Sequence, residues 1–171
     1  MALNIIKGDL FSNDSDAIVL NVDGLKKGME GFLARQFMSK YPELWKELQT
    51  YIKYPIPLGE IFIHRPENHQ YKLIVIASTL NHTDDLSPKE REDVVYSVFK
   101  KALKSVIKYK LKKIATGPMS GGWRVSAMNA FVMINNAFEE VVKGDDIDVN
   151  IYISNEYDFS KVSNLAKSMG W

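Results

Sequence analysis

Short apolar runs recur along the chain and predict the strands of a sheet. The two clearest are Ala17–Val22 (AIVLNV) and Leu73–Ala77 (LIVIA), which are continuous and rich in branched residues. Such runs are typical of strands buried on both faces, as in a parallel sheet between helices. Weaker runs predict further strands at Leu3–Ile6, Glu60–His64, Ile114–Ala115 and Val149–Ile153.

Between these runs, apolar residues recur at the three- and four-residue spacing of amphipathic helices. The predicted helices are Phe32–Met38, Leu44–Ile52, a segment from Ser87-Pro88 to Ile107, Val125–Val142 and Phe159–Met169. Ser87 is suited to cap the third of these, with proline at its first position. The alternation predicts an α/β fold, a three-layer α/β/α sandwich with a mixed, mainly parallel central sheet. The length of 171 residues fits one domain, residues 1–171.

Two glycine-containing loops follow predicted strands. Asp23–Gly31 (DGLKKGMEG) comes after Ala17–Val22, and Gly117–Gly122 (GPMSGG) comes after Ile114–Ala115. Glycine lets a backbone approach a ligand closely, and the free amides at a helix start favour an anion. Ligands of such sheets bind beyond the carboxyl ends of the strands, so both loops are expected at one phosphate-binding edge. An ordinary tight turn between strand and helix is the alternative interpretation.

The composition narrows the classes of function. The net charge of +1 gives no bulk attraction to nucleic acid or to a membrane surface. The absence of cysteine excludes disulfides, thiolate catalysis and cysteine-ligated metals. The three histidines, His64, His69 and His82, lack metal-ligand spacing, so neither a metal nor a cofactor is expected. Without a signal-peptide core or a membrane-length apolar run, a cytoplasmic protein is expected.

A row of lysines accompanies the third predicted helix. Lys100, Lys101, Lys104 and Lys108 lie largely away from its apolar stripe. A lysine face can bind nucleic acid, but no aromatic platform is interleaved with these residues. A solvated helix surface is therefore the favoured interpretation, and the sequence leaves the oligomeric state open.

Three motifs in order suggest a family. The first motif, residues 5–23 (IIKGDLFSNDSDAIVLNVD), resembles an opening strand, a Gly-Asp-Ile turn and a strand ending in Asn-Ala-Ala-Asn. The second, residues 28–37 (GMEGFLARQF), resembles a first phosphate loop with its helix. The third, residues 117–128 (GPMSGGWRVSAM), resembles a second such loop. In this order and spacing the chain resembles the macro domain family, α/β modules that bind ADP-ribose. The resemblance runs from Ile5 to Ile153 and implies a divergent member that binds ADP-ribose or a related nucleotide diphosphate.

The resemblance also implies particular site residues. The ligand-binding positions are Asp9, Leu10, Asn21, Gly28, Gly31, Ser120, Gly121, Gly122 and Trp123. Asp9 matches the aspartate that accepts a hydrogen bond from the adenine amino group, although a turn residue after Gly8 is the alternative. Gly28 and Gly31 match the loop beside the pyrophosphate and distal ribose, and Ser120 begins the loop whose amides hold the phosphates.

The chain departs from the family pattern in the first loop. The final asparagine of Asn-Ala-Ala-Asn, which contacts the distal ribose, falls at Asp23, whereas Asn21 supplies an amide two residues earlier. The first asparagine becomes Leu20, and Lys26 and Lys27 replace two glycines. The loop is therefore expected to carry more charge than is usual in the family.

Catalysis is an alternative to simple binding. Glu30 matches the loop aspartate of one hydrolysing branch, and Asp23 lies near it in sequence. Both are candidate catalytic residues of a hydrolase of ADP-ribosyl esters or of ADP-ribose 1″-phosphate, with Glu30 as a base. The alternative for Glu30 is an acid at a helix N-terminus, which the helix dipole favours. A second hydrolysing branch uses a lysine and an aspartate; this chain has Ser78 and Arg124 at the corresponding positions, so that chemistry is not expected. A further alternative is a macro-like scaffold without a ligand that binds a protein or RNA partner.

Overall fold

Strands and helices alternate in the computed structural model, which describes residues 1–25, 31–80, 84–120 and 124–171. The strands are β1 (Ala2–Lys7), β2 (Ala17–Asp23), β3 (Ile61–His64), β4 (Leu73–Leu80), β5 (Lys113–Thr116) and β6 (Asp148–Ile153). The helices are α1 (Phe32–Lys40), α2 (Pro42–Tyr51), α3 (Pro88–Lys108), α4 (Ala127–Val141) and α5 (Glu156–Ser168). Each strand and helix expected from the apolar pattern is present.

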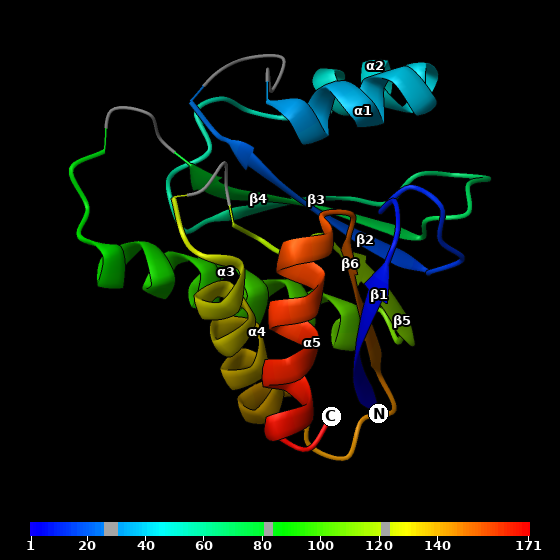
Figure 1. The fold of residues 1–171 in the computed structure, drawn as a ribbon. Helices are drawn as coiled ribbons and strands as arrows, with labels where there is room; N and C mark the ends of the chain where they lie inside the picture. Colours follow the sequence, from blue (N-terminus) through cyan, green and yellow to red (C-terminus); the bar gives the residue numbers. More distant parts are fainter. Residues whose placement is uncertain (26–30, 81–83, 121–123) are drawn as a thin grey trace.

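The described strands form one six-stranded sheet in the order β1-β6-β5-β2-β4-β3. Strand β3 pairs antiparallel with β4, and the other neighbouring pairs are parallel. Helices α1 and α2 cover one face, and α3, α4 and α5 cover the other (Figure 1). The predicted three-layer sandwich with a mixed, mainly parallel sheet is therefore confirmed.

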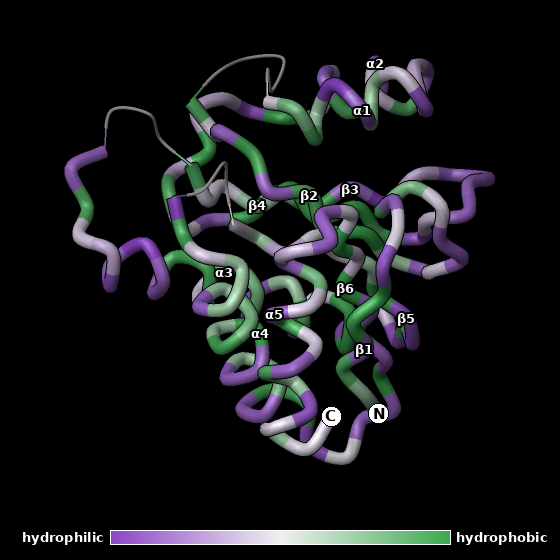
Figure 2. Tube along the Cα trace, in the orientation of Figure 1, coloured by the Kyte–Doolittle hydropathy of each residue, from purple (hydrophilic) through white to green (hydrophobic). Residues whose placement is uncertain are grey.

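The central strands supply both hydrophobic cores. In β2, Ala17 and Val19 pack toward α3 and α4, whereas Ile18 and Leu20 pack toward α1 and α2. This alternation follows from the two-residue period of a strand, and it explains why the run is apolar throughout. Figure 2 shows the same apolar character concentrated in the strands between the helical layers.

Helix ends follow capping side chains more closely than the apolar pattern. At the start of α3, Ser87 accepts from the Glu90 amide while Glu90 accepts from the Ser87 amide, as expected for a capping box. Helix α4 begins at Ala127 instead of Val125, because the Ser126 side chain accepts from the amide of Asn129. Helix α5 begins three residues earlier than predicted, at Glu156, because Asn155 caps it in the same way.

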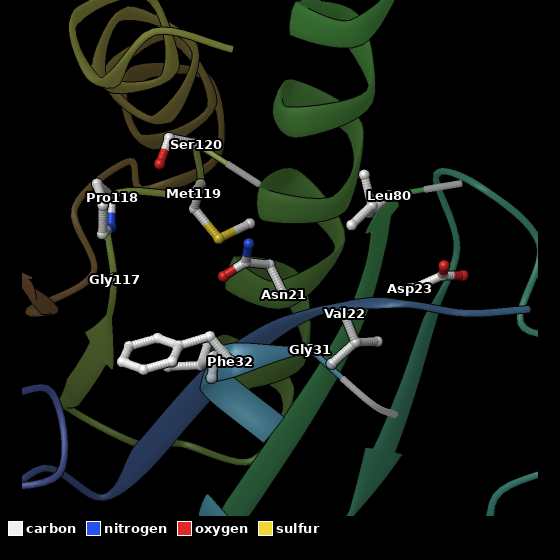
Figure 3. Close-up of a pocket in the computed structure, with 11 residues that line it drawn as sticks. Asn21, Val22, Asp23, Gly31, Phe32, Leu80, Gly117, Pro118, Met119 and Ser120 are labelled. Carbon is white, nitrogen blue, oxygen red and sulfur yellow. The ribbon is translucent and has the colours of Figure 1, made fainter. Parts of the chain in front are cut away.

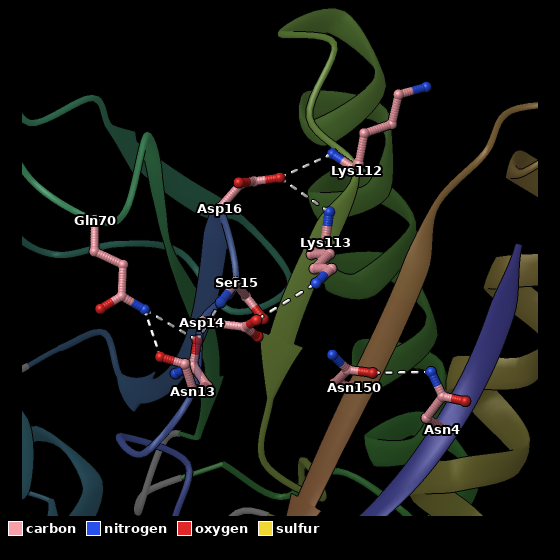
Figure 4. A network of polar contacts seen from close by, with 9 residues as sticks. All are labelled: Asn4, Asn13, Asp14, Ser15, Asp16, Gln70, Lys112, Lys113 and Asn150. Carbon is pink, nitrogen blue, oxygen red and sulfur yellow. Dashed lines mark hydrogen bonds and ion pairs between the residues drawn. The ribbon is translucent and has the colours of Figure 1, made fainter.

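Asp16 joins three strands at their amino ends. Its carboxylate accepts from the backbone amides of Lys112 and Lys113, both at 3.2 Å, where β5 begins (Figure 4). Its carbonyl accepts from the amide of Lys72, beside the start of β4, at 2.7 Å. This end of the sheet is thus closed by internal hydrogen bonds, and it lies opposite the carboxyl ends where ligands of such sheets bind.

Two of the lysines of α3 pair with acidic side chains of other elements. Lys100 pairs with Glu140 at 2.6 Å, and Lys101 pairs with Glu60 at 2.8 Å. The two ion pairs are consistent with the solvated helix surface that the sequence favours for this face. In the part of the chain that the structure describes, none of the helices combines the length and apolar character needed to cross a membrane.

Candidate functional site

Two cavities lie at the carboxyl ends of the parallel strands. The β1–β6 cavity, of about 540 Å³, is lined largely by residues at the ends of β1 and β6 and just beyond them, among them Gly8, Asp9, Leu10, Tyr152, Ser154, Asn155 and Asp158. The β2–β4 cavity, of about 410 Å³, is lined by Asn21, Val22 and Asp23 of β2 and by Leu80 of β4. They lie where an α/β sheet places its ligand.

The two cavities share a wall and form one cleft. Phe32 and Leu33, from the first turn of α1, line both cavities. Gly117, Pro118 and Ser120, from the loop after β5, also line both. Gly31, which ends the first predicted loop, lines the β2–β4 cavity together with Gly117, which begins the second. The described ends of both loops therefore meet at one edge of the sheet.

Asp9 forms a turn and also lines the cleft. Its Oδ1 accepts from the amide of Phe11 at 2.9 Å, and its carbonyl accepts from the amide of Ser12 at 3.1 Å. This is the turn role that the sequence leaves open, in which a short acidic side chain binds its own backbone. The Asp9 carboxylate is nevertheless exposed in the β1–β6 cavity, and the turn uses one of its two oxygens.

Asn21 and Asp23 both lie in the lining of the β2–β4 cavity. The register of β2 against β4 shifts between Val22 and Asp23, so that Asp23 pairs with Leu80. Figure 3 shows the Asn21 amide pointing toward Met119 across the cavity. Asp23 is buried, and its Oδ1 accepts from the amide of Leu25 at 3.0 Å. Asn21 and Asp23 therefore line the same cavity from different parts of the end of β2.

The second loop has an unusual backbone at Met119. This residue has a φ of 63°, in the left-handed region, and its side chain is buried in the core beneath the loop. A non-glycine residue in this region is uncommon and needs support from its surroundings, which the buried thioether chain provides here. The conformation presents Ser120 to both cavities.

Several predicted site residues fall in the segments 26–30 and 121–123. These are Gly28, Glu30, Gly121, Gly122 and Trp123, together with Lys26 and Lys27 of the first loop, and they lie outside the described residues. Their roles stay predictions. Among the described residues, no group of three or more His, Asp or Glu side chains is arranged to hold a metal ion.

A model of the Macro domain family matches residues 24–129, which is more than half of the chain. The chain belongs to the macro domain family. The resemblance seen in the sequence is thereby confirmed, and the matched range contains the second glycine loop and all of the first except Asp23.

Solved structures show the same fold at low sequence identity. The Oceanobacillus iheyensis macrodomain with ADP has a TM-score of 0.80 and 22% identity, with 98% of this chain and 90% of that chain covered. A mutant of the same macrodomain with ADPR has a TM-score of 0.79 and 21% identity, with 98% of this chain and 92% of that chain covered. The macrodomain of Thermus aquaticus DarG has a TM-score of 0.72 and 21% identity, with 89% of this chain and 98% of that chain covered. A search of curated proteins found no match.

Ser78 and Arg124 of this macro domain are engaged within the protein. The Ser78 hydroxyl is buried and donates to the carbonyl of Ile56 at 2.9 Å. Arg124 pairs with Asp84 at 2.6 Å. The strand-end side chain that lines the cleft is Leu80, two residues beyond Ser78. The two positions that correspond to the lysine and aspartate of the second hydrolysing branch, Ser78 and Arg124, therefore make structural contacts in this chain.

Asp84 forms an ion-paired cluster with two arginines. Its nearly buried carboxylate lies between Arg124, which precedes α4, and Arg91, in the first turns of α3, at 3.2 Å. Burial raises the pKa of Asp84, but the Leu86 amide and the two guanidinium groups together bring it below its ordinary value. The cluster fixes the segment after β4 against the segment that leads into α4.

Phe32, Leu80 and Met119 are among the cleft residues that sequence reasoning missed. The sequence pattern places Phe32 only at the start of a helix and Met119 only in a loop, and it assigns Leu80, which lies beyond the predicted strand Leu73–Ala77, to no element. Their apolar character signals a core position, and the sequence holds no sign that they line a cavity. Their contribution depends on how α1, β4 and the second loop are placed around the cleft.

Proposed function

We propose that this macro domain binds ADP-ribose, or a closely related nucleoside diphosphate, along the cleft formed by the two cavities. The observation that carries the proposal is the continuity of the cleft from Asp9 to Asn21 and Asp23, past the loop that begins at Gly117. The adenine lies in the β1–β6 cavity, and the distal ribose lies in the β2–β4 cavity. The family's association with ADP-ribose supports the same assignment.

The β1–β6 cavity is suited to an adenine ring. Asp9 offers a carboxylate oxygen to the exocyclic amine, which can only donate. Leu10 and Tyr152, both largely buried, supply apolar surface beside it. A purine is a flat, mostly apolar group with polar edges, and such groups bind in apolar pockets that carry a few placed polar atoms.

The wall shared by the two cavities is suited to the diphosphate. A Cβ added at Gly31 or at Gly117 would meet no heavy atom within 4 Å, so open space lies beside both glycine backbones. A phosphate can therefore approach these main chains closely. Asn21 then offers an amide to a ribose hydroxyl in the second cavity.

Calorimetric titration with ADP-ribose tests the proposal, with ADP and AMP as controls. We expect saturable 1:1 binding, with affinity falling from ADP-ribose to ADP to AMP as fewer parts of the cleft are filled. Absence of measurable ADP-ribose binding by the folded protein would refute the proposal and favour the scaffold alternative. Release of ADP-ribose from a glutamate-modified protein, lost in Glu30→Gln, would establish the hydrolase alternative.

Asp9→Asn is the sharper test of where adenine binds. The asparagine oxygen can still accept from the Phe11 amide, so the turn is kept, but the second oxygen becomes an NH₂ donor facing the adenine amine. We expect ADP-ribose binding to weaken by about 1–3 kcal/mol, the range for leaving a buried hydrogen-bonding group without its partner. The matched control is Asp14→Asn, because Asp14 is exposed and pairs with Lys113. Equal affinity in Asp9→Asn and wild type would remove Asp9 from the site.

A further inference from the structure

Phe32 is the most exposed large apolar side chain in the described part of the chain. Its exposed fraction is 78%, although it occupies the first position of a helix whose neighbouring residues Ala34 and Phe37 are buried. The packing of α1 on the sheet does not use this ring. A single exposed aromatic needs no explanation in general, but the location of this one is particular.

The Phe32 ring lies where the two cavities meet, a place here called the waist of the cleft. Phe32 belongs to the lining of both cavities, and so do Gly117 and Pro118 from the opposite loop. Figure 3 shows the ring projecting beneath the Gly117–Pro118 segment. A ligand that occupies both cavities therefore passes between the Phe32 ring and this segment.

We propose that Phe32 is a specificity-determining residue that selects ligands long enough to occupy both cavities. This inference rests on the proposed function and deepens it. A ligand that crosses the waist covers the exposed ring, and removing apolar surface from water favours the bound state. The covering ring also excludes water from the diphosphate, which strengthens its hydrogen bonds to backbone amides. A ligand confined to the β1–β6 cavity gains less from the ring.

The test compares ADP-ribose, which spans the cleft, with AMP, which ends at one phosphate. Wild type, Phe32→Ala, Phe32→Leu and Phe32→Tyr are titrated with both ligands by calorimetry. We expect Phe32→Ala to weaken ADP-ribose binding about tenfold and AMP binding by less than about threefold, because the longer ligand covers more of the aromatic ring than a ligand confined to the β1–β6 cavity. Phe32→Leu should lie between wild type and Phe32→Ala, and Phe32→Tyr should remain close to wild type.

Controls separate a binding effect from loss of structure. Met38→Ala removes another exposed apolar side chain from the same helix, and Met38 is absent from the linings of both cavities. It should leave both affinities unchanged. Because Phe32 is exposed, thermal melting should give the same midpoint for its variants as for wild type; Phe32→Leu provides the comparison if the alanine variant is unstable.

Three results would overturn the inference. Equal losses for ADP-ribose and AMP in Phe32→Ala would show that the ring contacts adenine and does not select for length. Unchanged ADP-ribose affinity in Phe32→Ala, with binding by wild type intact, would refute the role of Phe32 and leave the proposed function standing. Failure of wild type to bind ADP-ribose would refute both.

Discussion

Replacing Gly24 with alanine is expected to lower the free energy of unfolding by about 3 kcal/mol. A Cβ at this position would lie 2.3 Å from the Ser78 hydroxyl oxygen and 2.4 Å from the Ile56 carbonyl oxygen. Those two atoms are hydrogen-bonded to each other, and the Gly24 carbonyl accepts from the Ile56 amide at 2.7 Å. The new methyl group must therefore separate a buried hydrogen bond or displace the end of β2.

Urea unfolding of Gly24→Ala and wild type measures this effect. Gly117→Ala is the matched control, because a Cβ there meets no heavy atom within 4 Å, and its stability should change by no more than about 0.5 kcal/mol. Gly24 directly follows Asp23 in the cleft lining, so the variant should also weaken ADP-ribose binding. Wild-type stability in Gly24→Ala would show that this junction is looser than described.

Replacing Asp84 with alanine is expected to lower the free energy of unfolding by about 2 kcal/mol. The loss of the carboxylate leaves two neighbouring guanidinium groups without their shared partner. Removing one partner of a buried ion pair costs about 3–5 kcal/mol, and the partial exposure of Arg91 and Arg124 reduces that value. Chemical unfolding at neutral pH measures the loss, with Asp85→Ala as control because Asp85 is the exposed neighbour.

The same cluster predicts a dependence on pH. The pKa of Asp84 in the folded chain lies below its ordinary value, so the carboxylate contributes stability above the unfolded-state pKa of about 3.9. This contribution is lost as the pH falls from there through the folded-state pKa. The stability difference between wild type and Asp84→Asn should therefore be constant near neutral pH and shrink below about pH 4. A difference that persists at the lowest pH would assign the effect to packing.

The architecture could be predicted from the sequence because buried positions are apolar in a pattern that reflects each strand or helix. The apolar runs of β2 and β4 are buried on both faces. The apolar residues of α3, which recur at three- and four-residue spacing, pack on the sheet. Helix starts were placed less well at α4 and α5. There a capping side chain, Ser126 or Asn155, decides where the helix begins, and the apolar pattern carries no record of that choice.

The site was partly accessible from the sequence. Asp9, Asn21 and Ser120, chosen by resemblance to the family, all lie in the cleft lining, although their roles in binding remain predictions. Phe32 and Met119 were not identified as site residues from the sequence. The exposure of the Phe32 ring and the left-handed backbone of Met119 both depend on the tertiary structure. Apolar side chains in a cleft have the same local pattern as those in a core.

A crystal structure of the chain with ADP-ribose would locate each part of the ligand. We expect adenine in the β1–β6 cavity with its amino group within hydrogen-bonding distance of Asp9, and the distal ribose beside Asn21 in the β2–β4 cavity. The diphosphate should pass between Phe32 and the Gly117–Pro118 segment. A ligand bound in the reverse orientation, or outside the two cavities, would refute the proposed binding mode.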